Sequence, residues 1–155
     1  TILFGGGSYT FEARVQIGDL AVTTTEEYTA RIGFLDSTTA EPTDGCYFLY
    51  SQADASWVAV CRSNNTETSS ATDTTVDVVA DTWTVLTIEV NAAANSCVFK
   101  INGTTVRTET ANIPSGTSRH TGVGLSLIRS AGAGTTSIAM PIDYVAMQIG
   151  LTATR

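Results

Sequence analysis

The chain has 155 residues, of which 43% are hydrophobic and 15% are charged, and its formal net charge is −7. This composition supplies enough apolar side chains for a folded core and argues against a disordered chain. An acidic chain with a single lysine, Lys100, is a poor partner for nucleic acid or an anionic membrane, and no apolar run is long enough for membrane insertion.

The length predicts a single domain over residues 1–155. The first residues, TILFGGGSYTF, lack the charged and apolar regions of a signal peptide. We therefore interpret the chain as a fragment of a longer protein or as a cleaved product.

Two stretches near the start alternate apolar and polar residues with a period of two. Tyr, Phe, Ala, Val and Ile alternate with polar side chains over residues 9–17, and residues 28–34 repeat the pattern. This period is typical of a strand with one buried face. A turn-rich loop is expected to follow over residues 37–45.

The next two strands are expected at residues 46–51 and 57–62, joined as a hairpin. In that pairing Cys46 and Cys61 lie almost opposite each other on one face. A disulfide between them is an alternative, but two separate buried thiols fit the pattern better. Cys97 alternates with apolar residues and is expected in the core.

The segment over residues 81–107 has the clearest strand pattern in the chain. Three apolar side chains of its first strand share a face: Leu86, Ile88 and Val90. Asn102-Gly103 predicts a type I′ hairpin turn, because both central residues of that turn need a positive φ. Centring the turn there pairs Phe99 with Val106 across the hairpin.

Polar loops separate the remaining strands, and no stretch has a helical period. We expect these further elements: a loop with a short edge strand over 63–75, a short strand over 76–80, an irregular loop over 112–122, and final strands over 122–129 and 138–149 that flank a flexible tract over 130–136. So many short strands, each followed by turn residues, predict an all-β fold, a two-sheet antiparallel β-sandwich.

Several stretches resemble a known superfold. TWTVLTIEVN, SCVFKINGTTV and the closing IDYVAMQIG resemble the concanavalin A-like jelly roll of laminin-G and legume-lectin domains. FEARVQIGDL and RIGFLDSTTAEPTDGCYFLY look like the jelly-roll modules of bacteriophage tail, fibre and decoration proteins. The resemblance implies a jelly roll at a virion surface or in another extracellular place, homo-oligomers such as trimers, contacts with other virion proteins and binding of cell-surface glycans.

Three functions follow as hypotheses. The first is a non-enzymatic, lectin-like structural and adhesion module of a virion that binds host-surface glycans. The second is a purely architectural domain that oligomerises or decorates without a ligand. The third is a glycan-cleaving enzyme, which the sequence disfavours because glycanases of this fold carry a characteristic carboxylate triad, E-x-D-x-x-E, that is missing here.

Carbohydrate binding has one candidate constellation, built on two aromatic residues near the turn of the 46–62 hairpin. Sugar rings stack on aromatic faces, and amide, imidazole and guanidinium groups bind their hydroxyls. The predicted site residues are Tyr50, Trp57, Arg62, Asn64, Asn65, Arg119 and His120. The alternative for Tyr50 and Trp57 is a cross-strand aromatic pair that belongs to the core.

No catalytic residue and no required cofactor is predicted. His120 is the chain's only histidine and lacks a nucleophile motif beside it, so we interpret it as a loop residue. One histidine and scattered cysteines do not have the spacing of a standard zinc centre. Loop carboxylates can hold calcium, and Asp36, Glu41 and Asp44 are the candidates, although no fixed spacing distinguishes them.

Overall fold

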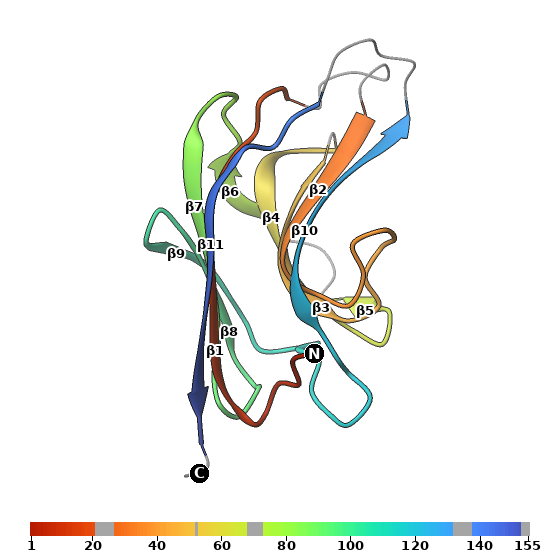
Figure 1. Cartoon of the computed structure of the whole chain (residues 1–155), viewed down its shortest axis with the longest axis vertical. Helices are drawn as coiled ribbons and strands as arrows, with labels where there is room; N and C mark the ends of the chain where they lie inside the picture. Colours follow the sequence, from red (N-terminus) through yellow and green to blue (C-terminus); the bar gives the residue numbers. More distant parts are fainter. Residues whose placement is uncertain (21–26, 52, 68–72, 132–137, 153–155) are drawn as a thin grey trace.

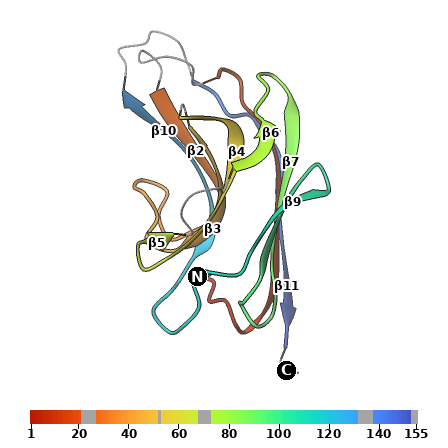
Figure 2. The same cartoon turned by 180° about the vertical axis from the view of Figure 1, so that it is seen from behind.

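The computed structural model describes residues 1–20, 27–51, 53–67, 73–131 and 138–152, which form eleven β-strands. The strands lie in two antiparallel sheets that face each other, as Figures 1 and 2 show from opposite sides. The expected all-β, two-sheet antiparallel sandwich is therefore confirmed. None of the described residues belongs to a helix that could cross a membrane. The tract over 130–136 falls mostly outside the described residues.

The first sheet has five strands in the order β11-β1-β7-β8-β9. Their bounds are Gly7–Gln16 for β1, Trp83–Val90 for β7, Cys97–Ile101 for β8, Thr104–Glu109 for β9 and Ile142–Leu151 for β11. Strand β1 is internal, because it pairs with both β11 and β7 along nearly its whole length. Its alternating apolar side chains therefore contribute to this sheet's inner face.

The second sheet has the order β10-β2-β3-β4-β5, and β6 pairs with the start of β4 whereas β5 pairs with its end. Its strands are Glu27–Leu35 for β2, Gly45–Ser51 for β3, Asp54–Ser63 for β4, Thr66–Glu67 for β5, Asp73–Asp77 for β6 and Gly122–Ala131 for β10. The short β5 confirms the edge strand expected within residues 63–75. The strand expected at 76–80 instead begins three residues earlier, at Asp73.

The core lies between the sheets and contains the side chains that the alternation predicted to be buried. Phe11, Ala13 and Val15 of β1 and Leu86 and Ile88 of β7 have no measurable exposure. Aromatic rings meet across the gap edge to face, which is a favourable geometry for ring pairs. The centroids of Phe48 on β3 and Phe99 on β8 are 5.2 Å apart, and Figure 1 shows these strands in opposite layers.

The Asn102-Gly103 turn forms as predicted, with positive φ at both residues. The pairing beyond it was wrong by one position, because a β-bulge between Phe99 and Lys100 shifts the register and places Phe99 opposite Arg107. A bulge inserts one unpaired residue into one strand, and alternation alone does not reveal it.

The residues before β1 are also part of the fold. Ile2 forms a backbone bridge to Thr121, and Phe4 bridges to Ser115. The Phe4 ring packs against Phe34 with 5.2 Å between centroids, so the residues before β1 extend the core.

Candidate functional site

Three segments meet at one end of the six-stranded sheet, where Asp44 joins them. The buried Asp44 carboxylate accepts a hydrogen bond from the backbone N–H of Asn64 at 2.8 Å and one from Nη1 of Arg119 at 3.3 Å. The loops over 36–44 and 115–121 are thereby tied to the turn after β4. Figure 2 shows these loops near β5 and the N-terminus.

Arg62 extends this network at the end of β4. Its Nη1 donates to Glu41 Oε1 at 2.5 Å and lies 3.3 Å from Glu67 Oε2. Burial opposes the charge of this guanidinium, but the interactions with Glu41 outweigh burial and raise the pKa of Arg62 above its usual value. Arg62 is thus a fixed cation that anchors the loop over 36–44.

An open, polar cavity of about 310 Å³ lies beside this network. Its walls are formed by Thr1, Leu35, Asp36, His120, Thr121 and Gly122. The Asp36 carboxylate accepts a hydrogen bond from the Thr43 N–H at 3.0 Å, which fixes its position, and His120 is exposed. A carboxylate and an imidazole at the rim can exchange hydrogen bonds with the hydroxyl groups of a small polar ligand.

The structure therefore brings together five predicted site residues, which are Arg62, Asn64, Asn65, Arg119 and His120. Asn64 and Asn65 are exposed and have φ values of 53° and 62°, which suit asparagine in a tight turn. The Asn65 N–H donates to the Thr43 carbonyl at 3.0 Å. Their backbones hold the turn, and their side chains stay accessible.

Tyr50 and Trp57 are not part of this site, and their predicted role in sugar stacking is corrected. They are 2% and 1% exposed, respectively, and lie toward the other end of the β3–β4 hairpin. Their centroids are 6.0 Å apart, and Tyr28 packs edge to face on Tyr50. A sugar ring cannot reach aromatic faces in the core, so the alternative, a cross-strand core pair, describes them.

The three calcium candidates do not converge on one point. Glu41 is engaged by Arg62, Asp44 by Arg119, and Asp36 by the Thr43 N–H. Among the described residues, the group of three metal-ligating side chains whose ligand atoms lie within 4.8 Å of one another consists of cysteines. Because each of these carboxylates has a different partner, the geometry does not favour calcium here.

Two features of the site had no clear signal in the sequence. The sequence suggested Asp44 only as a calcium ligand, yet it is the buried acceptor that organises the loops. Thr121 lines the cavity, and its Oγ1 is buried without a hydrogen-bond partner. Both roles depend on loops that are far apart in the chain, so residue spacing does not predict them.

A family model for the SO2946-like, C-terminal domain matches residues 2–143. The chain belongs to this family. The crystal structure of SO2946, a protein of unknown function from Shewanella oneidensis MR-1, is similar with a TM-score of 0.66 and 12% identity. The match covers 99% of this chain and 62% of SO2946, so this domain spans less than two thirds of that family member. A search of curated proteins finds no match.

Two further solved structures share the architecture. Alginate lyase A1-II′, of polysaccharide lyase family 7, matches with a TM-score of 0.56 and 12% identity, covering 97% of this chain and 66% of the lyase. The receptor binding domain of botulinum neurotoxin mosaic serotype C/D matches with a TM-score of 0.54 and 12% identity, covering 95% and 34%. At such low identities the structural matches establish the fold alone. They confirm that this chain has a jelly-roll β-sandwich fold.

Proposed function

We propose that this domain is a non-enzymatic structural and adhesion module, displayed on a virion surface or otherwise outside the cell, that binds a host-surface glycan at the loop end. The resemblance to phage tail, fibre and decoration modules supports the virion setting. The acidic, lysine-poor chain fits a protein that avoids nucleic acid and anionic membranes. Other virion proteins are then its neighbours.

The observation that carries the glycan proposal is the polar cavity between Asp36 and His120. Its rim offers an acceptor and an imidazole, and the Arg119–Asp44 pair holds the adjoining loop. A preorganised rim binds hydroxyl groups at a smaller entropic cost than mobile loops do. The same architecture occurs in a lyase whose name specifies a polysaccharide and in a receptor binding domain, which supports this choice of ligand.

The two buried carboxylates do not form a glycosidase pair. Among the described residues, Asp44 and Glu109 are the buried acidic side chains, and each is paired with an arginine. They belong to different sheets, Asp44 next to β3 and Glu109 at the end of β9. A glycosidase needs two neighbouring carboxylates as acid and nucleophile or base, and this pair does not have that arrangement.

The glycan proposal predicts specific binding on a glycan array that depends on the cavity rim. His120→Ala and Asp36→Ala should each weaken binding about tenfold, since each removes a hydrogen-bonding group worth roughly 1.4 kcal/mol. The control is Asp143→Asn, which alters an exposed ion pair with Arg14 on the other sheet and should bind like the wild type. Surface plasmon resonance on the best glycan gives the affinities.

Other outcomes of this experiment are equally clear. Binding to no glycan, or binding that is unchanged in both rim variants, would remove the proposed site. Loss of binding in EDTA would restore calcium as a cofactor. If incubation with the domain cleaved the glycan into shorter products, the domain would be a glycan-cleaving enzyme instead.

The architectural alternative is supported by β11. Val145, Met147 and Ile149 pair with the inward-facing residues of β1, yet they are 41%, 45% and 43% exposed because the second sheet does not cover them. β11 also ends the strand order of its sheet, so no other described strand pairs with its outer edge. An exposed apolar face on an open edge favours pairing with another chain. We propose that a second copy covers it within a homo-oligomer, which a trimer would satisfy.

We expect light scattering to give an oligomer mass for the wild type and a monomer mass for Met147→Glu, which places a charge on the apolar face. Gln148→Glu is the matched control, because it adds the same charge to the other face of the same strand, and it should keep the oligomer. A monomeric wild type at all concentrations would contradict the proposal that copies pair through β11.

A further inference from the structure

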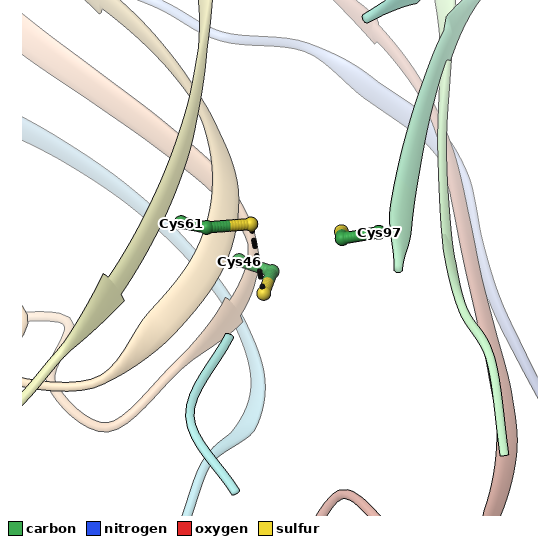
Figure 3. A group of neighbouring side chains, drawn as sticks. All are labelled: Cys46, Cys61 and Cys97. Atoms are coloured by element: carbon green, nitrogen blue, oxygen red, sulfur yellow. Dashed lines mark hydrogen bonds between the residues drawn. The ribbon is translucent and has the colours of Figure 1, made fainter. Parts of the chain in front are cut away.

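All three cysteines of the chain meet at one place inside the sandwich. Cys46 on β3 is directly opposite Cys61 on β4, and both side chains point inward. Cys97 begins β8 in the other sheet. Figure 3 shows Cys46 and Cys61 together on one side of the core, with Cys97 facing them from the other. All three are fully buried.

The sulfur atoms are close enough to share a ligand. The Sγ atoms of Cys46 and Cys61 are 3.3 Å apart, and the three Sγ atoms lie within 4.8 Å of one another. Three thiolates around one metal ion at about 2.3 Å are separated from each other by roughly 3.8–4.0 Å. Small side-chain rotations would therefore convert the observed cluster into a coordination sphere.

We propose that Cys46, Cys61 and Cys97 bind one thiophilic d10 metal ion, Zn²⁺ or Cu⁺, between the two sheets. Thiolates are the ligands that select these soft ions. On binding, each thiol releases its proton to solvent and its sulfur forms one bond to the metal, with no change in oxidation state. The bound ion would link the two sheets, because its ligands come from both.

One buried carboxylate lies beside the cluster. Glu109 on β9 is directly opposite Cys97, is buried, and pairs with Nε of Arg107 at 2.5 Å. Burial, with a smaller contribution from the Glu109 charge, raises the pKa of all three thiols. Because a metal ion binds the thiolate forms, these raised pKa values oppose metal binding, and uptake should increase as the pH is raised.

Two simpler explanations account for less of the geometry. A disulfide between Cys46 and Cys61 would join neighbouring strands of one sheet, but it leaves the approach of Cys97 unexplained. Plain core packing needs no sulfur, since alkyl side chains such as Ala59 and Val90 fill adjoining positions. Metal binding would give all three sulfurs one common role.

Because the sulfurs are buried, the ion must enter before folding is complete. The test is to unfold the reduced full chain, refold it with a small excess of Zn²⁺ or of Cu⁺ in a buffered complex, and desalt it. Native mass spectrometry and elemental analysis then count the metal per chain. We expect one ion of at least one of these metals per chain. A rise of about 5–10 °C in the unfolding midpoint is expected if free metal exceeds its dissociation constant a hundredfold.

Cys97→Ala should abolish metal uptake and the metal-dependent rise in the midpoint. Val90→Ala is the matched control, because Val90 is opposite Cys97, is buried, and loses core volume without loss of sulfur. It should lower the midpoint but keep one ion per chain. Three results would overturn the proposal: no uptake of either metal, equal uptake by Cys97→Ala, or a Cys46–Cys61 disulfide in the protein purified under reducing conditions.

Discussion

Replacing Trp57 with alanine is expected to lower the free energy of unfolding by about 3–5 kcal/mol, the usual cost of deleting a buried aromatic side chain. Trp57 is 1% exposed, and its ring lies 6.0 Å from that of Tyr50 and 6.3 Å from that of Phe48. The total free energy of unfolding of a native domain is only about 5–15 kcal/mol, so this substitution removes a large part of the stability. Urea unfolding followed by fluorescence measures it.

Trp83 provides a matched control, as it is the second of the two tryptophans in the chain. It is 37% exposed and stacks under the Arg14 guanidinium, whose Cζ is 5.0 Å from the ring centroid. Exposed cation–π pairs contribute about 0.5–1 kcal/mol, so Trp83→Ala should cost roughly 1 kcal/mol. Equal costs for the two alanine variants would contradict the buried position of Trp57.

A measurement of glycan binding distinguishes the two roles that the sequence allowed for Trp57, which are sugar stacking and core packing. Trp57→Phe keeps an aromatic ring in the core and should leave a folded domain with unchanged glycan affinity. A specific loss of affinity in this folded variant would return Trp57 to the binding site.

Local periodicity predicted the parts of the fold that depend on one strand and its immediate partner. The alternation over residues 9–17 gave the buried face of β1, and Asn102-Gly103 gave the type I′ turn because both φ values must be positive. The opposition of Cys46 and Cys61 followed from counting across one hairpin. Each of these inferences used contacts that are near in the sequence.

Contacts between the sheets were beyond this reasoning. Alternation places Cys97 on the inner face of β8, but it does not state which residues of the other sheet lie opposite. The convergence of Cys97 with Cys46 and Cys61 therefore needed the structure. The alternating pattern of β11 likewise indicates an apolar face. It does not predict that the second sheet leaves this face uncovered.

The candidate site was predictable only in part. Arg62, Asn64 and Asn65 are close to Asp44 because the end of β4 pairs with the start of β3, which the predicted hairpin implies. Their contact with the loop that carries Arg119 depends on tertiary packing. Tyr50 was ambiguous because both faces of β3 carry apolar residues, so composition did not identify the inner face.

A glycine inside β2 shows how the packing between sheets constrains the sequence. Gly33 has a φ of +149°, and an added Cβ would lie 2.6 Å from Cδ1 of Ile88 and 2.7 Å from the carbonyl oxygen of Cys46. A third clash, at 2.8 Å, is with Cα of Tyr47. Glycine within a strand often marks such a close approach, and here the neighbours belong to both sheets.

Gly33→Ala should therefore lower the free energy of unfolding by about 2–5 kcal/mol, through backbone strain and overpacking together. Gly122→Ala is the matched control in the neighbouring strand, where the nearest atom to an added Cβ is the Leu35 carbonyl oxygen at 3.8 Å. That variant should stay within about 0.5 kcal/mol of the wild type or gain slightly, because alanine restricts the unfolded chain. Urea unfolding of the two variants under one set of conditions compares them directly. Similar stabilities would mean that the sheets do not approach closely at Gly33, and the packing that also brings Cys97 to Cys46 would then need revision.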